Sequence, residues 1–513
     1  MLKKFLFSSV LTAAVAVSAI ATAEDAPQAK QPVKSAKATH KKVVHHSKKK
    51  HHDDAYSPSA HKKDGLREEV LLLASSQKQG SFAEAPRDKL VNHDGVSVKV
   101  GGRVNVQYGV IDQQKEFKNP SNNGNLPQSA NNKPGTMPTF GGNGSKYANQ
   151  HAMVSSGELT FTAEKDHDGN KYGLELNTNA SASASSSGST DIANKAFLFM
   201  ENKMGRFEVG AVDGPSKSMG LSAGTIAKGT GGIDGGDYSS WIPYGSVGGE
   251  TNVMLEDTFL TSPNLPYASQ YSKKANKLNY YSPTVNGFKL GLGYVRDVTV
   301  KGTTFEALSF KAFKGSGYEN VFEAGASYEH KVNDMSFAVS ATGQVGEARP
   351  AYNETSTDGK ATSQTIELKR LGAWQVGGKV AFNKFAVAAS YGDWGKSGTL
   401  KTPVANAPKP TAKFWTAGVS YDHSDKAGFS LTYFGSERKG AFSMKALNYI
   451  TANADKFAAA KQKFEALSVG GEYKVLPGLV PYTEVTHFKY KTTLADAKGN
   501  KGTVFLGGVK LNF

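Results

Sequence analysis

The sequence predicts an all-β protein, folded as a transmembrane antiparallel up-and-down β-barrel of 16 strands. Three observations predict it. The candidate strands alternate strictly between apolar and polar residues, several of them are long enough to cross a bilayer, and the connections between them alternate between long and short. A barrel strand crosses a bilayer in about 9–11 residues, and its lipid-facing and water-facing side chains alternate.

The composition is compatible with this fold and excludes some chemistry. The chain has 513 residues, 55 of them glycine, and it lacks cysteine, so disulfide bonds and thiolate metal sites are excluded. The mean hydropathy of −0.43 is typical of a soluble protein. Alternating strands also give a low average, because they never form a long apolar run.

Residues 1–23 predict a secretory signal peptide. Lys3 and Lys4 form a basic head, residues 5–20 form an apolar centre, and residues 21–23 (Ala-Thr-Ala) provide a cleavage site of small residues. The alternative, an N-terminal membrane anchor, fits the short flanks and the clear cleavage signal less well. No later segment reaches the ~18 apolar residues of a spanning helix, so an exported membrane protein of this sequence has to cross with strands.

Residues 24–64 predict a disordered periplasmic leader rich in lysine and histidine, because they contain too few apolar residues to form a core. Its histidines suggest weak binding of Zn or Ni, but no fixed ligand geometry is visible, which favours a solvated tether that contacts anionic cell-wall polymer or lipid headgroups. Residues 65–80 predict a short helical segment, since Leu66, Val70 and Leu73 have helical spacing.

The barrel is predicted over residues 95–513. Every second residue from Val96 to Val110 is Val or Tyr apart from Gly102, and the residues between them are polar or glycine. The same alternation recurs in segments such as GELTFTAEK, FEAGASYEH and TVFLGGVKLNF, which gives about sixteen candidate strands. One stretch departs from the pattern: residues 446–467 are rich in Ala, Lys and Glu and predict a helix in an external loop.

The connections follow the asymmetry of outer-membrane barrels, which have short periplasmic turns and long external loops. Eight long connections alternate with seven short ones such as KDHDGN, SPTVNG and VLPG. This count places both termini on the side of the short turns.

The two faces of the strands predict different surroundings. Tyr and Trp residues recur near the strand ends on the apolar face, as at a membrane–water boundary. A soluble β-core uses the same residue types, but strand length and loop asymmetry favour lipid. The other face carries Ser, Thr, Asn, Gly and charged residues, and a 16-stranded barrel is too wide for side chains to fill. The expected interior is an aqueous channel with a polar lining.

Three motifs resemble the Gram-negative trimeric general diffusion porin family. Residues 276–288 resemble its N-x-x-x-Y-x-S-P-x-x-x-G-F signature, the chain ends in GGVKLNF with Phe513 last, and residues 194–214 resemble the strand–turn–strand before its constriction loop. The resemblance implies a 16-stranded barrel, a homotrimer, and a third loop, here residues 213–275, that folds into the lumen and constricts it.

By this resemblance, carboxylates of the third loop face basic residues of the barrel wall across the pore. The acidic candidates are Asp213, Asp234, Asp237, Glu250, Glu256 and Asp257, and the inward basic candidates are Lys99, Arg103 and Lys379. The chain departs from the family where arginine is expected, since Tyr281 and Ala211 stand there. The basic half of the constriction is therefore expected to be thin.

The functional expectation is a porin that passes ions and small hydrophilic solutes by passive diffusion. A substrate-selective channel for phosphate or sugar, with Trp241 and Tyr244 as an aromatic track, stays open as an alternative, as does a structural or adhesive outer-membrane protein. No nucleophile, metalloprotease or phosphate-loop motif is present, so we expect no enzyme activity and no cofactor. The expected partners are two further copies of the chain, outer-membrane lipid and lipopolysaccharide, with no nucleic acid.

Overall fold

The structure, a computed structural model, describes the greater part of the chain after residue 88. The described residues are 88–93, 95–114, 150–179, 193–232, 237, 241–242, 272, 274–298, 300–302, 318–349, 351–357, 360–399, 401, 411–439, 461–493 and 500–513. The predicted signal peptide (1–23), leader (24–64) and short helix (65–80) lie outside them.

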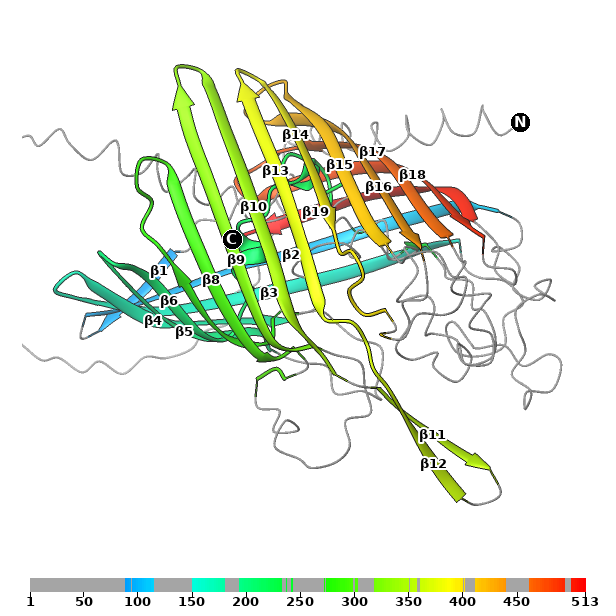
Figure 1. The fold of residues 1–513 in the computed structure, drawn as a ribbon. Helices are drawn as coiled ribbons and strands as arrows, with labels where there is room; N and C mark the ends of the chain where they lie inside the picture. Colours follow the sequence, from blue (N-terminus) through cyan, green and yellow to red (C-terminus); the bar gives the residue numbers. More distant parts are fainter. Residues whose placement is uncertain are drawn as a thin grey trace, which may run out of the picture. The chain divides into compact units, whose positions relative to one another are not determined.

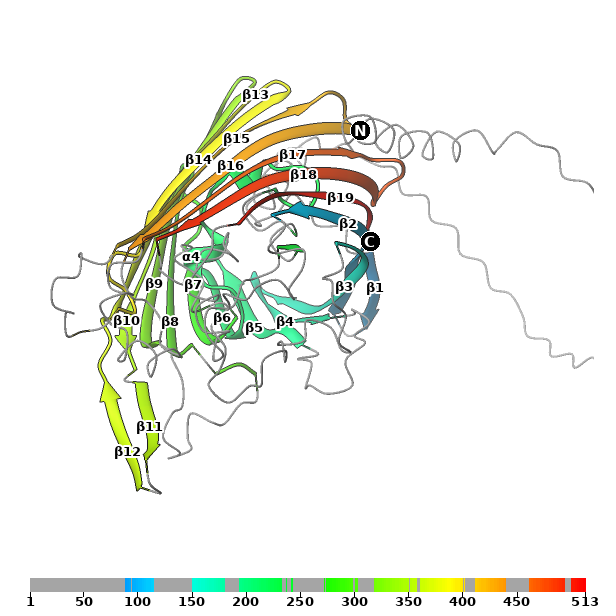
Figure 2. The same cartoon turned by 90° about the vertical axis from the view of Figure 1, so that its right-hand side faces the viewer.

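Sixteen antiparallel strands form a closed ring. Its members are β2 (Val96–Gln113), β3 (His151–His167), β4 (Asn170–Asn179), β5 (Ala193–Asn202), β6 (Gly205–Ala211), β7 (Asn276–Tyr281), β8 (Phe288–Asp297), β9 (Tyr318–Val332), β10 (Met335–Ala348), β13 (Leu371–Phe382), β14 (Phe385–Asp393), β15 (Thr411–Asp422), β16 (Ala427–Lys439), β17 (Lys461–Tyr473), β18 (Leu479–Thr492) and β19 (Asn500–Asn512). Each strand pairs with the next in this order, and β19 pairs with β2, so that Val509 lies opposite Val106. The predicted 16-stranded up-and-down barrel is confirmed (Figures 1 and 2).

The need for a closed ring comes from the hydrocarbon that surrounds a membrane barrel. A backbone N–H or C=O without a partner costs several kcal/mol in hydrocarbon, so a sheet that spans a membrane can have no open edge there. The contact between the end of the chain and β2 gives partners to backbone groups that an open edge would leave unpaired. The N–H of Gly102 donates to the carbonyl of Phe513 over 2.8 Å, and the N–H of Phe513 donates to the carbonyl of Gly102 over 3.0 Å.

The short turns are built from residues that accept a positive φ. Asp168 and Gly169 have φ values of 52° and 77°, and Asn286 and Gly287 have values of 50° and 86°. Two consecutive positive φ angles match the twist of a two-stranded hairpin, and Asp-Gly and Asn-Gly are the pairs that adopt them most readily.

Three local features differ from the sequence expectation. β1 (Asp88–His93) precedes the predicted start of the barrel at residue 95 and pairs with Val96–Val100 of β2. The pairing of β2 with β19 begins only at Arg103. A separate hairpin, β11 (Ala351–Thr357) with β12 (Lys360–Ile366), lies in the connection between β10 and β13 (Figure 1). The predicted helix over 446–467 is wrong for residues 461–467, which belong to β17, because pairing with β16 and β18 outweighs the helix propensity of Ala, Lys and Glu.

The outward face is apolar all round the ring. Large apolar side chains are widely exposed there, for example Phe288 (60%), Leu292 (58%) and Val387 (54%). A soluble monomer rarely exposes contiguous apolar surface of this extent, so the face fits contact with lipid. Among the described residues, no helix has the length and apolar character needed to cross a membrane.

The inward face is polar only over part of its height. At the long-loop end it carries a set of buried apolar side chains, which we name the apolar collar: Ile111, Val295, Tyr318, Val321, Leu371, Ala373, Ala412, Phe414, Phe434, Phe464, Ala466, Phe488, Tyr490, Val504 and Leu506. Phe414 and Phe434 stack with ring centroids 6.4 Å apart. The expectation of a polar lining throughout is therefore wrong at this end, where protein packs inside the ring.

Candidate functional site

The segment that follows β6 runs along the inner wall of the barrel. Residues 213–232, which we name the belt, contain the short helix α4 (Pro215–Ser218) and the 3-10 turn η3 (Ala223–Thr225). α4 contacts β8, β9 and β10, and η3 contacts β14, β15 and β16. α4 lies inside the ring in Figure 2. Of the rest of the predicted constriction segment 213–275, the structure describes only 237, 241–242, 272 and 274–275.

Hydroxyl groups of the wall hold the backbone of the belt. The N–H of Leu221 donates to Ser340 Oγ over 3.0 Å, that of Ala223 to Thr416 Oγ1 over 3.0 Å, and that of Lys228 to Ser430 Oγ over 2.8 Å. The belt has no partner strand for these N–H groups, and a buried N–H needs an acceptor. Inward serines and threonines on three strands therefore fix its course.

Glu484 on β18 anchors the far end of the belt. Its Oε2 accepts hydrogen bonds of 2.9 Å from both the N–H and the hydroxyl of Thr230. The hydroxyl of Thr230 in turn accepts the N–H of Asp237 over 2.9 Å. The segment thus crosses from β18 to β2, where Gln107 donates to Asp237 over 2.9 Å.

Two inward glycines let the belt lie flat on the wall. A Cβ on Gly377 of β13 would collide with the carbonyl of Leu221, and a Cβ on Gly470 of β17 would collide with the carbonyl of Lys228. Both belong to Gly-Gly pairs whose second glycine faces outward. The space these glycines leave is filled by belt backbone.

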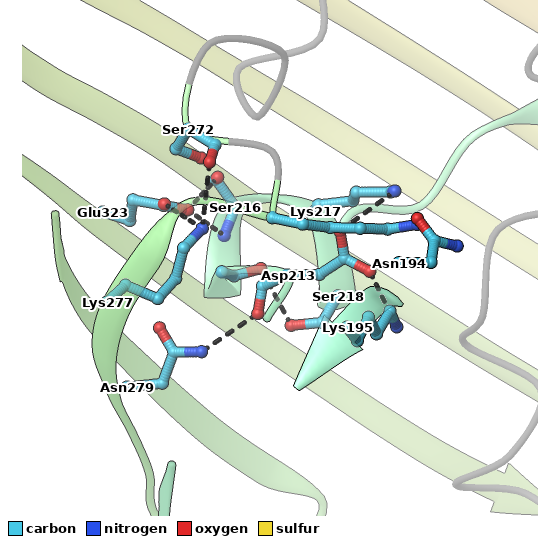
Figure 3. Close-up of polar contacts among 12 residues, drawn as sticks. Asn194, Lys195, Asp213, Ser216, Lys217, Ser218, Ser272, Lys277, Asn279 and Glu323 are labelled. Carbon is cyan, nitrogen blue, oxygen red and sulfur yellow. Dashed lines mark hydrogen bonds and ion pairs between the residues drawn. The ribbon is translucent and has the colours of Figure 1, made fainter. Parts of the chain in front are cut away.

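At the start of the belt, one carboxylate lies among several ammonium groups (Figure 3). Asp213 is 2.9 Å from Lys195 Nζ of β5 and 3.1 Å from Lys217 Nζ of α4. The side-chain amide of Asn279 on β7 donates to the backbone carbonyl of Asp213 over 2.9 Å. Lys274, just before β7, is the third ammonium group near this carboxylate.

Lys274 links this cluster to the wall at β2 and β3. Its ammonium group donates to Asn194 of β5, and the amide of Asn194 donates to Glu158 of β3 over 3.3 Å. Glu158 also pairs with Arg103 of β2 at 3.2 Å. Lys274, Asn194, Glu158 and Arg103 thus form a continuous series of polar contacts from the residues before β7 to β2.

The charges around Asp213 change the pKa values of the loop groups. Burial alone would raise the pKa of Asp213, but Lys217, Lys195 and Lys274 outweigh it and hold the pKa well below the ordinary value. Burial lowers the pKa of Lys274 to about 8; Asp213 opposes this change, while Lys217 and Lys195 add to it. Lys274 therefore changes charge close to neutral pH.

Beneath α4 lies an ion pair without exposed surface. Lys277 of β7 and Glu323 of β9 are 3.2 Å apart, and both side chains are 0% exposed. Ser216 donates to Glu323 through its N–H over 3.3 Å and through its hydroxyl, and Gln344 of β10 donates to Ser216 Oγ over 3.0 Å. The pair ties α4 to three wall strands (Figure 3).

The basic residues predicted from strand parity all face inward, with different surroundings. Lys99 pairs with Glu164 at 2.5 Å, and Arg103 pairs with Glu158 at 3.2 Å. Lys379 lies on β13 two residues from Gly377, where the belt crosses.

Of the predicted carboxylates, Asp213 and Asp237 are held in the network described above. Burial raises the pKa of Asp237, although Gln107 donates a hydrogen bond to it. Asp234, Glu250, Glu256 and Asp257 lie outside the described residues.

The basic residues nearest the belt were not predicted from the sequence. Lys195, Lys217 and Lys274 surround Asp213, and the thin basic half of the constriction stays a prediction. Strand parity could have identified Lys195, since the apolar alternates Ala196, Leu198 and Met200 face outward. Lys217 and Lys274 have no strand parity to identify them.

Beyond the belt, Trp241 and Ile242 pack into the apolar collar. The Trp241 ring lies against Gly109 of β2, where a Cβ would overlap it. Trp241 was one of the two residues of the predicted aromatic track, and it packs on the wall. Tyr244, the other, lies outside the described residues.

Comparison with protein-family models decides the family. The model described as Gram-negative porin matches residues 70–493, more than half of the chain. The chain belongs to the Gram-negative porin family.

Relatives and solved structures similar to this porin span most of its length. An uncharacterized protein of Rickettsia typhi is 26% identical over 370 residues, which cover 62% of this chain and 76% of the relative. A second, of Rickettsia bellii, is 27% identical over 364 residues with the same coverage. Among solved structures, OmpT of Vibrio cholerae has a TM-score of 0.46 at 13% identity, and an anion-selective porin from Comamonas acidovorans has 0.44 at 12% identity. Each covers 82% of this chain and 100% of its own.

The family and the barrel together identify this porin as a β-barrel channel protein of the Gram-negative outer membrane. The belt contacts the polar part of its inner wall, and the apolar collar lies toward the long loops.

The buried pair under α4 gives a stability prediction for this porin. We expect Lys277→Met to lower the free energy of unfolding by about 3–5 kcal/mol, because it leaves Glu323 charged and buried without its partner. Adding Glu323→Gln removes that charge and should recover most of the loss. Urea unfolding of the refolded protein in lipid vesicles measures both.

The exposed pair Lys401–Glu367, at 2.8 Å with both side chains 64% exposed, provides the control. Lys401→Met should cost less than about 1 kcal/mol, since solvent screens such a pair. Equal losses for Lys277→Met and Lys401→Met would show that the buried pair does not fix α4.

Proposed function

We propose that this porin forms a water-filled channel for the passive diffusion of ions and small hydrophilic solutes, and that it works as a homotrimer. The belt is the proposed constriction. One observation carries the proposal: a segment with charged side chains is held on the polar inner wall of a closed ring of 16 strands.

The distribution of charge supports selection by charge as well as by size. On one side of the belt, Lys195, Lys217 and Lys274 surround Asp213. At its far end, Glu484 and Asp237 are held by Thr230 and Gln107. Lys228 and Lys510 also lie at this far end, where both contact Glu472. Charged groups lining a narrow pore select ions by sign, and because basic groups occur at both ends of the belt we propose mild selectivity.

A substrate-selective channel and a structural or adhesive role are the other candidates. The packed position of Trp241 weakens the case for an aromatic sugar track. The separate β11–β12 hairpin in the connection between β10 and β13 leaves an adhesive role open, which can coexist with transport (Figure 1). The proposal includes no enzyme activity, no cofactor and no nucleic acid. Contact between the basic leader and the cell wall, and between the barrel and outer-membrane lipid, belongs to it as well.

Planar-bilayer recording of the refolded protein tests the channel. We expect stepwise conductance increases grouped in threes. Small neutral solutes that enter the pore should lower the conductance, and neutral solutes above a limiting size should not. Protein that has been heat-denatured before addition is the control. A correctly folded barrel that gives a silent bilayer would contradict the proposal and favour the structural role.

Arg103 gives the first selectivity prediction. Arg103→Ala removes a positive charge and leaves Glu158 without its pair, so the lumen becomes more negative. We expect the cation-to-anion permeability ratio to rise by about fourfold, because one unit charge roughly 10 Å away in water changes the permeability of each ion by about twofold, in opposite directions. The reversal potential in a KCl gradient measures it. Glu158→Gln should move the ratio the opposite way, and no change in either variant would remove this pair from the ion path.

Lys274 gives a pH prediction. With a pKa of about 8, its side chain is mostly charged at pH 7 and mostly neutral at pH 9. The lumen loses most of one positive charge over this range, so the cation-to-anion permeability ratio should rise by about threefold between pH 7 and pH 9. Lysines of ordinary pKa titrate above this range.

Reversal potentials recorded at half-unit pH steps test this prediction. Lys274→Gln should show a flat profile over the same range. An identical step in this variant and in the wild type would show that another group causes it.

A further inference from the structure

The belt crosses several strands that place a glycine on their inward face. These glycines, which we name the glycine track, are Gly291 of β8, Gly325 of β9, Gly377 of β13, Gly418 of β15 and Gly470 of β17. At each of them, a Cβ atom would come within 3.2 Å of an atom of the belt. A larger residue on the track therefore takes space that the belt occupies.

At the start of the belt, two glycines of the track make a hollow for one side chain. Gly291 and Gly325 lie directly opposite each other in the pairing of β8 with β9. The sulfur of Met219 would be 2.6 Å from a Cβ atom on Gly291 and 2.8 Å from one on Gly325. Met219 is buried, so a side chain of the belt fills this hollow.

Farther along, the atoms that lie against the track belong to the backbone of the belt. The carbonyl of Leu221 lies against Gly377, and the carbonyl of Lys228 lies against Gly470. Both stretches are also held by hydrogen bonds from their N–H groups to hydroxyl groups of the wall. A side chain avoids a new methyl group by rotating, but a backbone carbonyl moves only with its segment. A Cβ atom at Gly377 or Gly470 would therefore displace the belt itself.

The outward glycines beside the track have neighbours of a different kind. A Cβ atom on Gly378 would be 3.6 Å from the nearest atom and one on Gly471 would be 3.3 Å from it, and in both cases that atom belongs to an adjacent barrel strand. Glycine weakens a strand, because it loses much backbone entropy on folding and packs no side chain. On the inward face this loss is offset by close contact with the belt, which indicates a role for the glycines of the track.

We propose that the glycine track sets the distance between the belt and the wall, and thereby the width of the channel. Gly377 and Gly470 are positioning residues in this proposal, since they act through the backbone of the belt. The width of a pore decides which neutral solutes pass, so glycines of the wall determine the size limit of this porin. The inference rests on the proposed function, because the belt narrows a path for solutes only if the barrel conducts them.

Conductance and solute exclusion by Gly377→Ala and Gly470→Ala test the proposal in planar bilayers at high salt, where charge effects are screened. Heavy atoms in contact prefer a separation of about 3.5–4.0 Å, so each methyl group should move the belt by about 1 Å into the lumen. We expect each variant to lose about a fifth of the single-channel conductance, and the double variant about a third, because the narrowest cross-section limits the current. The largest neutral polymer that enters the pore should become smaller in the same order.

Gly378→Ala and Gly471→Ala are the matched controls. They make the same chemical change on the same two strands but on the outward face, so conductance and size limit should stay at the wild-type values. Heat-modifiable gel migration of all four variants shows whether each barrel is folded.

Two further tests apply if the carbonyl contacts prevent the folding of Gly377→Ala or Gly470→Ala. At Gly418 the belt atom in the way is the Cβ of Ala223, at 3.2 Å, so Gly418→Ala should fold and cause a smaller loss of conductance. Gly325→Ala should also lower the conductance. Adding Met219→Ala should restore it, because the sulfur then leaves the space that the new methyl group takes.

Three results would overturn the inference. Folded Gly377→Ala and Gly470→Ala, or Gly418→Ala in their place, could conduct as the wild type does. Any of them could conduct more than the wild type, which would show that the new methyl group frees the belt instead of moving it into the lumen. The outward controls could lose as much conductance, which would assign the effect to the strands. A wild-type barrel that does not conduct would instead contradict the proposed function, so the two failures are distinguishable.

Discussion

The fold depends on one constraint: no backbone hydrogen-bonding group may be left open in hydrocarbon. The constraint requires a closed ring, which the pairing of β19 with β2 completes. Once the ring is closed, the alternation along each strand assigns one face to lipid and the other to the interior. Phe288 and Leu292 of β8 lie outward. Gly291 and Gly293 on the same strand face inward and lie against the belt.

The same constraint explains how the belt is held. The belt lies inside the ring without a partner strand, so its N–H groups take acceptors from Ser340, Thr416, Ser430 and Glu484 on the wall. The polar inward face therefore supplies the acceptors that fix the belt. Toward the long loops the inward face becomes the apolar collar, where Trp241 and Ile242 pack. The interior thus changes from polar to apolar along the height of the barrel.

Sequence alone predicted the strands well, because a period of two is a local property and pairing preserves it. Parity correctly placed Lys99, Arg103 and Lys379 inward, but it could not show that Glu158 and Glu164 neutralise two of them, since that depends on the register between β2 and β3. The lysines around Asp213 come from β5, α4 and the residues before β7, and only the fold brings them together. For residues 461–467 the local sequence predicted a helix, but pairing with β16 and β18 makes them part of a strand. Phe414 was not predicted to face inward. It stands next to the outward-facing Trp415, and two adjacent aromatic residues do not follow the apolar–polar alternation.

The most direct test of the account is which face of a strand meets water. The chain contains no cysteine, so single cysteines can be introduced by Gly378→Cys, Lys379→Cys, Val380→Cys and Ala381→Cys on β13 and exposed to a charged, membrane-impermeant thiol reagent in lipid bilayers. The account predicts rapid modification at positions 379 and 381, which face inward, and protection at positions 378 and 380, which face lipid. Equal modification at all four positions, or the reverse pattern, would contradict it.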